Sequence, residues 1–193
     1  MAGDTARQAL RQATDAAHER LHHLPGFDRL AAGSIGRAEY VALLRRLLGF
    51  HGAVETAMAA APSLLPFGIA IEDRRRAPLL EADLNALGAE PDAAPPPLAP
   101  PTSAAAAMGW LYVVEGSTLG GRHLARGLDA LLGEEVAGRR FLLGHGARHG
   151  AMWRACCDAI EQCGAAPGGL AAMIDGANDA FRHFEEWFAV ETA

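Results

Sequence analysis

Alanine occupies 42 of the 193 positions, and this enrichment limits the possible folds more than any other feature of the sequence. Alanine favours the helix more strongly than any other residue. Valine, isoleucine and threonine, which favour strands, are scarce. The apolar residues also recur at helical spacing along much of the chain. We therefore expect an all-α fold, and the length suits a single domain that spans residues 1–193.

Six segments combine helical periodicity with capping or terminating residues, and most are joined by short connections. The expected helices span residues 5–24, 37–61, 72–87, 103–132, 151–162 and 170–190. Ser34 is a candidate N-cap of the second helix, and residues 138–150 are expected to form a loop. Residues 89–101 contain six prolines in thirteen positions. We expect a stiff loop there, within the single domain rather than between two.

Charge and composition exclude several functional classes. The net charge is −6 and the pI is about 5.7, without the basic stripe of a nucleic-acid-binding protein. The apolar run over residues 104–114 is too short to span a bilayer, and the first residues lack the pattern of a secretion signal. The three cysteines do not form a disulfide framework and suit a reducing compartment. We expect a cytoplasmic protein that binds neither nucleic acid nor membrane.

A glycine-rich segment, Tyr112–Arg122, is the most informative part of the sequence. It contains Gly116, Gly120 and Gly121. Each glycine costs a helix about 1 kcal/mol relative to alanine, yet the flanks are helical, so the sequence predicts a kinked helix. Because Gly116 and Gly120 share one face, another group can approach the backbone there. That group is either a neighbouring helix in a tight crossing or a flat ligand.

His18 is the second informative residue. It lies at the edge of the apolar face that Leu10, Ala17 and Leu21 define in the first helix. A neutral imidazole there could coordinate an iron held between helices, although a structural role is the alternative. His22 lies one turn later on nearly the same face and competes with His18 as a ligand.

Three segments together resemble the heme oxygenase family. Leu10–His18 is similar to the proximal helix of that family, and Gly116–Gly121 is similar to its glycine-rich distal helix in the bacterial form. Ala177–Phe181 resembles the last core helix. The segments occur in the family's order, over about residues 5–190. The resemblance implies a helical bundle in which heme, both substrate and cofactor, lies between the first helix and the kinked glycine helix.

The resemblance also implies an activity, which is the cleavage of heme to biliverdin, CO and ferrous iron. His18 would be the proximal iron ligand. Gly116, Gly120 and Gly121 would let the distal backbone pass close to O2, and Ser117 stands where animal members carry an aspartate. Electrons would come from an external ferredoxin or reductase, and a bilin-binding photoreceptor is a candidate partner.

Cations are expected near the heme propionates. Arg11, Arg122 and Arg126 are candidates for this role, with solvated surface arginines as the alternative. Phe181 resembles a heme-contacting aromatic residue, and an ordinary core position is equally compatible. The run Arg74–Arg76 is expected to be a solvated helix start or a docking point for an acidic electron donor.

Two further functions remain open at this level. A non-catalytic heme-binding or sensor protein on the same fold is compatible with Ser117 and His22. Animal members of the family carry an aspartate in place of Ser117, although many bacterial members carry serine, and the family often has an acidic residue in place of His22. A related helical fold that binds thiamine-type or other small ligands is the third interpretation.

Overall fold

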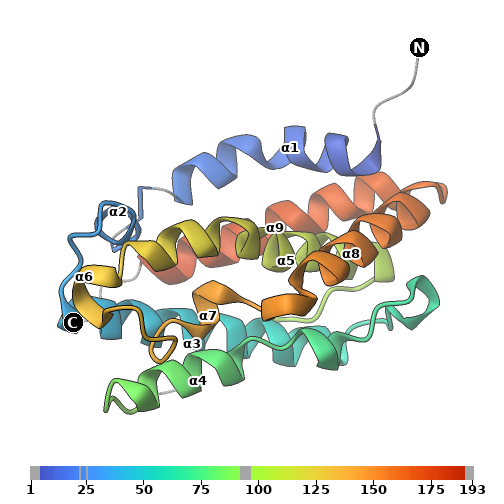
Figure 1. Ribbon diagram of the computed structural model, residues 1–193. Coiled ribbons are helices and arrows are strands. Elements are labelled where there is room, and N and C mark those ends of the chain that lie inside the picture. The colour runs from blue at the N-terminus through green and yellow to red at the C-terminus, as the bar shows by residue number, and fades with distance from the viewer. Residues whose placement is uncertain (1–4, 22, 25, 92–96, 190–193) are drawn as a thin grey trace.

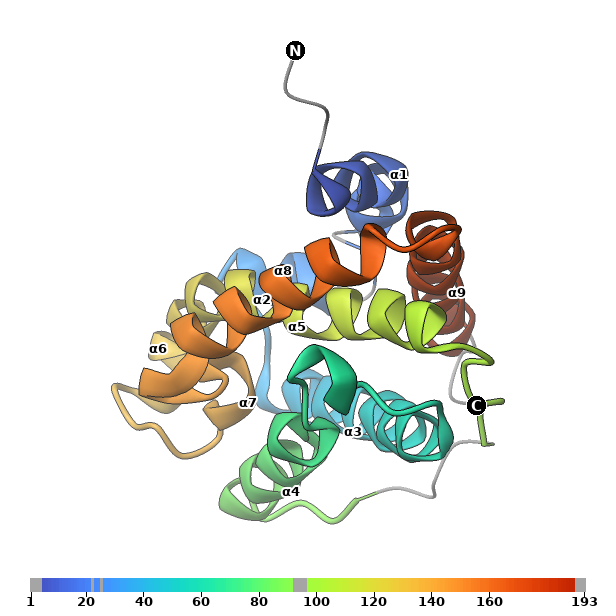
Figure 2. The ribbon, with the colours of Figure 1, turned by 90° about the vertical axis from the view of Figure 1, so that its right-hand side faces the viewer.

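The structure is a computed structural model that describes residues 5–21, 23–24, 26–91 and 97–189. Its long helices form three layers (Figures 1 and 2). The layers are α1 (Ala6–Leu21), then α5 (Ala104–Arg126), α8 (His149–Gly164) and α9 (Gly169–Ala189), and last α3 (Arg37–Ala60) and α4 (Ala77–Ala86). All regular secondary structure within the described ranges is helical, which confirms the all-α expectation. None of the helices in those ranges combines the length and apolar character needed to cross a membrane.

The helix expected over residues 72–87 is interrupted. Ile71–Arg74 forms a 3-10 turn (η2), Arg75 has an extended backbone with a ψ of 135°, and α4 begins only at Ala77. Pro78 explains the break, because proline has no amide hydrogen to donate and fits only in the first turn of a helix.

Two other boundaries differ from expectation. α5 ends at Arg126 rather than near residue 132, and α6 (Asp129–Leu132) follows as a separate turn. The segment 138–150, expected as a loop, contains the short helix α7 (Arg140–Leu143) and the 3-10 turn η3 (Gly146–Arg148). These short elements connect the middle layer to α4.

The connection between α1 and α3 also differs. It contains a short helix, α2 (Phe27–Ala31), where none was expected. Ser34 is not the N-cap of α3; Gly36 takes that position, and its amide donates to the Glu39 carboxylate at 3.0 Å. A further 3-10 turn, η1 (Leu65–Phe67), follows α3.

The core is organised around α5, which packs most extensively against α9. Glycines on both helices permit this close approach. A side chain at Gly109 would collide with the backbone of Met173, and one at Gly176 would collide with the backbone of Ala106. Trp110 is fully buried beside this crossing. α5 is therefore held firmly by its neighbour in the middle layer.

Carboxylates from distant helices cap the N-termini of three helices. Glu161 accepts hydrogen bonds from the first amides of α1, Glu55 from those of α4 and Asp83 from those of α7. An acidic group at a helix N-terminus satisfies free amides and interacts favourably with the helix dipole. These contacts fix where the three helices begin.

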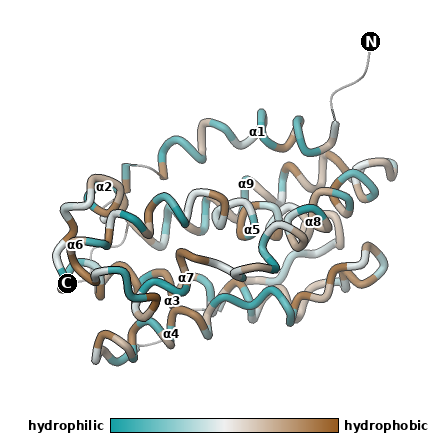
Figure 3. The backbone as a smooth tube through the Cα atoms, viewed as in Figure 1, coloured by the Kyte–Doolittle hydropathy of each residue, from teal (hydrophilic) through white to brown (hydrophobic). Residues whose placement is uncertain are grey.

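α1 is the most hydrophilic of the long helices (Figure 3). It buries only Leu10, Thr14 and Ala17, and it packs on α9 and α8. Arg20 adds an ion pair to Glu185 of α9 at 2.6 Å. The remaining faces of α1 are exposed, including the one that carries His18.

Candidate functional site

Two of the four glycines in α5 are required for helix packing. A side chain at Gly109 would collide with Met173 of α9, and one at Gly121 would collide with the carbonyl oxygen of Leu142 in α7. The tight-crossing interpretation therefore applies to these two positions. Gly121 has a structural reason to be glycine that does not depend on any ligand.

Gly116 and Gly120 are different. A Cβ atom at Gly116 would meet only a ring carbon of Trp153 at 3.9 Å, and one at Gly120 would have no heavy atom within 4 Å. Neither glycine is needed for contact with a neighbouring helix. α5 is helical without a break through both positions, and the expected kink stays a prediction. The open pair leaves a stretch of bare backbone on α5.

The position of Tyr112 relates this stretch to α1. Burial raises the pKa of Tyr112, and the nearby Thr14 hydroxyl and Arg11 guanidinium act in the opposite direction. Tyr112 and Thr14 therefore lie close together, and α1 and α5 run in the same direction (Figure 1). Four residues further along each helix are Gly116 and His18, so these two lie at about the same level.

His18 is exposed on α1. Because His18 and Gly116 lie at about the same level along their helices, one ligand could contact His18 on α1 and the backbone of Gly116 and Gly120 on α5. The competing ligand, His22, lies outside the described residues. The assignment of His18 as the iron ligand therefore stays a prediction.

A buried ion pair supports α5 from the side of η2. Glu115, which is 1% exposed, pairs with Arg74 at 3.1 Å. Arg74 also donates to the carbonyl oxygen of Met152 at 3.3 Å. The expectation that the arginine run is solvated is wrong for Arg74, because Glu115 offers it a buried counter-charge.

The same correction applies to Arg76, which is 1% exposed. Its guanidinium donates to the Ser117 hydroxyl at 2.9 Å and to the carbonyl of Phe141 at 3.0 Å, and it lies over the Phe141 ring at 3.9 Å. Burial lowers its pKa to about 10, against the opposing effect of Glu115. Arg76 therefore connects α4 and α7 to α5 at the glycine-rich segment.

His51 of α3 lies in the same buried region. Its ring packs edge-on against Phe141, with centroids 5.0 Å apart, and its Nδ1 atom has no hydrogen-bond partner among the described residues. Burial, followed by the charge of Arg76, lowers the pKa of His51 well below its usual value. The side chain is therefore neutral at physiological pH.

Thr118 links α5 to the start of α8. Its hydroxyl donates to the carbonyl of Glu115 at 2.6 Å, so the contact to His149 Nδ1 at 3.2 Å requires His149 to be the donor. Nearby, burial lowers the pKa of His145 to about 4. Thr118 thus connects the backbone of α5 to the first residue of α8 through two hydrogen bonds.

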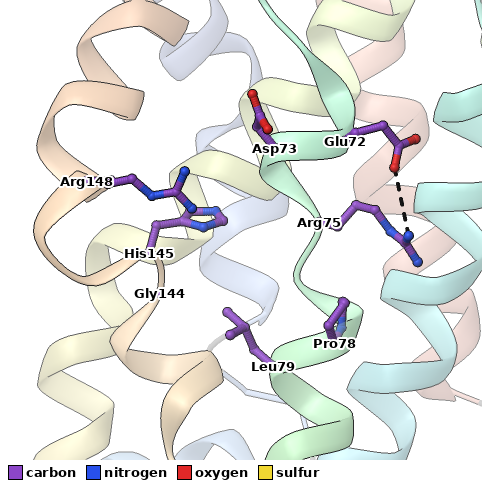
Figure 4. A pocket seen from close by; sticks show the side chains of 8 residues that line it. All are labelled: Glu72, Asp73, Arg75, Pro78, Leu79, Gly144, His145 and Arg148. Atoms are coloured by element: carbon purple, nitrogen blue, oxygen red, sulfur yellow. Dashed lines mark ion pairs between the residues drawn. The ribbon is translucent and has the colours of Figure 1, made fainter.

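Two surface hollows lie away from the open glycines. One, of about 500 Å³, is bordered by η2, α4 and the α7–η3 connection, and His145 and Arg148 extend across it towards Asp73 (Figure 4). The other, of about 670 Å³, follows α3. Neither is lined by a residue of α1 or of the segment 116–121.

The expected propionate cations do not come together. Arg11 lies near Tyr112, whereas Arg126 is the last residue of α5. With a rise of 1.5 Å per residue, the levels of Arg11 and Arg126 differ by about 25 Å along the helix axis. Arg122 is exposed and donates to the carbonyl of Gly146 at 3.3 Å. Phe181 is buried on α9, at 5% exposure. These four assignments stay predictions, and Arg11 and Arg126 cannot hold one edge of the same ligand.

The sequence reasoning missed Arg74, Arg76, Glu115 and His51. A signal for the arginines was available, because a cation at the N-terminus of a helix opposes the helix dipole. Nothing in the spacing of His51 distinguishes it from the other residues of the apolar stripe in α3.

The family profile described as heme oxygenase matches residues 4–190. The chain belongs to the heme oxygenase family. It is 35% identical over 169 residues to a heme oxygenase of Xanthomonas campestris pv. campestris, covering 84% of this chain and 96% of that protein. The predicted family and enzyme class are thereby confirmed. The function of the chain as a heme-degrading oxidoreductase is favoured over the non-catalytic alternative.

Solved structures of heme oxygenases share this fold. The NO- and CO-bound heme oxygenase of Neisseria meningitidis is 26% identical, with a TM-score of 0.77 and coverage of 98% of this chain and 95% of that one. Heme oxygenase-1 of the cyanobacterium Synechocystis, solved in complex with heme, has a TM-score of 0.72 at 19% identity and covers 96% and 91% of the two chains. The second likeness concerns the fold alone.

Proposed function

We propose that this heme oxygenase binds heme between α1 and α5, with His18 as the iron ligand, and opens the ring with O2 and electrons from an external ferredoxin or reductase. The products are biliverdin, CO and ferrous iron. The observation that carries the proposal is the open pair Gly116 and Gly120, at the level of His18. When bound, the heme iron supplies the site at which O2 is activated.

The residues fit a flat, apolar ligand whose metal would be held by one imidazole nitrogen. The backbone at Gly116 and Gly120 admits a planar group at close range, which any side chain there would displace. His18 offers an imidazole nitrogen from the facing helix. Most of the affinity then comes from burial of the apolar macrocycle, at about 25 cal/mol per Å².

Ser117 organises the proton supply on the α5 side. Its hydroxyl donates to the Val114 carbonyl at 2.7 Å and accepts from Arg76 at 2.9 Å, which leaves one lone pair and no hydrogen to give. A water at Ser117 must therefore donate to it. The second hydrogen of that water is then available to a group bound over Gly116 and Gly120.

Charged Arg76 sets the surroundings of this water, and neutral His51 packs against Phe141, the ring that Arg76 covers. Arg76 remains charged and places positive potential beneath Ser117, which favours negative charge on a nearby oxygen. The hydrogen-bonding capacity of the His51 Nδ1 atom suits an ordered water in the same buried region. Both groups act by position, without a covalent step.

The electron donor and the consumer of biliverdin are separate molecules in this proposal. The sequence carries no flavin or nicotinamide motif, so reduction needs a ferredoxin or reductase. A photoreceptor that binds a bilin is the partner we infer for the product.

Titration with hemin, followed by turnover, tests the proposed function. We expect a Soret band that saturates at one heme per chain, and a bilin spectrum after addition of air, a ferredoxin, its reductase and NADPH. A Soret band without formation of bilin would support the non-catalytic heme-binding alternative instead. Absence of saturable binding would refute the proposal altogether.

A further inference from the structure

Asp83 of α4 is a completely buried carboxylate that holds the start of α7. Its exposed fraction is 0%. One carboxylate oxygen accepts the Arg140 amide at 2.8 Å, and the other accepts the Phe141 amide at 2.9 Å. Burial raises the pKa of Asp83, and these amides together with the Arg140 side chain oppose the shift. Both oxygens are therefore used to fix a helix of only four residues.

α7 has no stability of its own, because a single turn cannot offset the entropy of forming it. Its position therefore depends on what holds its ends and its sides. The residues of α7 also contact the glycine-rich segment of α5. The Leu142 carbonyl lies against Gly121, and the Phe141 carbonyl accepts a hydrogen bond from Arg76 at 3.0 Å.

Arg76 completes the connection. It lies over the Phe141 ring at 3.9 Å and donates to Ser117 at 2.9 Å. A displacement of α7 would thus move the Phe141 carbonyl and ring together, and Arg76 with them. Ser117 would lose the donor that orients its hydroxyl.

We infer that Asp83 is a positioning residue for ring opening: through α7 it holds Arg76, Ser117 and Gly121 in their working arrangement. The inference rests on the proposed function, because that function places Ser117 beside the bound heme. Asp83 itself touches neither Ser117 nor Gly121; it acts through the backbone of Arg140 and Phe141.

The substitution Asp83→Asn separates this role from simple packing. Asparagine has the same shape but only one acceptor oxygen, so its amide group would face one of the two backbone N–H groups. We expect α7 to loosen while α4 keeps its core contacts. The matched control is Leu84→Ala, which truncates the neighbouring fully buried residue of α4 without touching the α7 amides.

Four readouts are needed for both variants: the unfolding midpoint and hydrogen exchange of the heme-free protein, heme affinity, and kcat for biliverdin formation. Asp83→Asn should speed exchange over residues 140–143 and 114–121, lower kcat by at least about tenfold and leave the heme dissociation constant within about threefold. Leu84→Ala should lower the unfolding midpoint by as much or more, and keep the wild-type kcat at a temperature where it is folded.

Equal kcat losses in the two variants would show that the role of Asp83 is only structural. Wild-type kcat in Asp83→Asn, despite faster exchange over 140–143, would also overturn the inference. If Asp83→Asn does not fold, Phe141→Leu tests the other end of the connection, because it keeps both amides but removes the ring beneath Arg76; unchanged kcat there would be equally decisive. A wild-type protein that forms no biliverdin refutes the proposed function, whereas the exchange data still test the coupling.

Discussion

Two adjacent glycines of α5 should respond in opposite ways to the same substitution. Gly120→Ala places a methyl group where no heavy atom lies within 4 Å. Gly121→Ala drives a methyl group into the carbonyl oxygen of Leu142. Both positions lie in one helix, so the gain from helix propensity is the same for each. A lower stability of Gly121→Ala than of Gly120→Ala therefore measures the net cost of placing the methyl group against Leu142.

The magnitudes follow from these surroundings. Alanine in place of glycine in a helix contributes about 1 kcal/mol. Overpacking against a fixed neighbour costs about 1–3 kcal/mol. Gly120→Ala should thus be more stable than the wild type by up to about 1 kcal/mol, and Gly121→Ala less stable than Gly120→Ala by about 1–3 kcal/mol. For a chain of this length, that difference corresponds to roughly 2–12 °C in melting temperature.

Calorimetry on the heme-free proteins, with hemin titration and turnover, would measure both effects. Gly120→Ala should melt higher but bind heme more weakly and turn over more slowly, because its methyl group enters the space assigned to the ligand. Equal melting temperatures for the two variants would refute the packing argument for Gly121. Wild-type affinity and turnover in Gly120→Ala would remove the reason for placing heme there.

Three other perturbations test separate parts of the site. His18→Ala should fold normally and lose the histidine-ligated heme spectrum and most turnover, whereas His23→Ala, also exposed, should keep both; ligation that survives in His18→Ala would contradict the assignment. Arg11→Gln should change the ratio of biliverdin isomers measured by chromatography, and Arg126→Gln should not, since only Arg11 lies near the facing stretch of α1 and α5; the reverse result would place the propionates at the other end. Folded His51 stays neutral while the unfolded residue takes up a proton below pH 6.5, so the wild type should lose up to about 1.4 kcal/mol per pH unit as the pH falls below that value. Urea unfolding at pH 6.5 and 5.5 should show a smaller loss in His51→Leu, and identical losses would mean that this histidine does not titrate as argued.

Local patterns were sufficient for the helical class and for the open pair in α5. Alanine content and apolar periodicity act within one helix, and so does the four-residue spacing of Gly116 and Gly120. The sequence could not show that Gly121 is needed for packing while Gly116 and Gly120 are not. The residue that Gly121 packs against, Leu142, is distant in sequence and belongs to a segment expected to be a loop.

The missing parts of the prediction depend on contacts between distant residues. Glu55 begins α4 by accepting amides 21 and 22 positions away, and Asp83 begins α7 from 57 and 58 positions away. No local pattern contains such a partner, so the capping of α4 by Glu55 and the existence of α7 were not visible. The acceptors of Arg76 could not be identified for the same reason, since they come from α5 and α7. The break at Arg75 is different, because Pro78 marks the first turn of α4 in the sequence itself.

The choice of arginine at position 76 has a consequence for how the enzyme responds to its medium. A pKa of about 10 leaves only about one molecule in a thousand uncharged at pH 7. A lysine in the same buried position would start from a lower pKa and would lose its proton readily on burial. The cation that contacts Ser117 of α5 therefore stays protonated over the whole physiological pH range. Turnover that varies with pH in the neutral range must owe that variation to some other group.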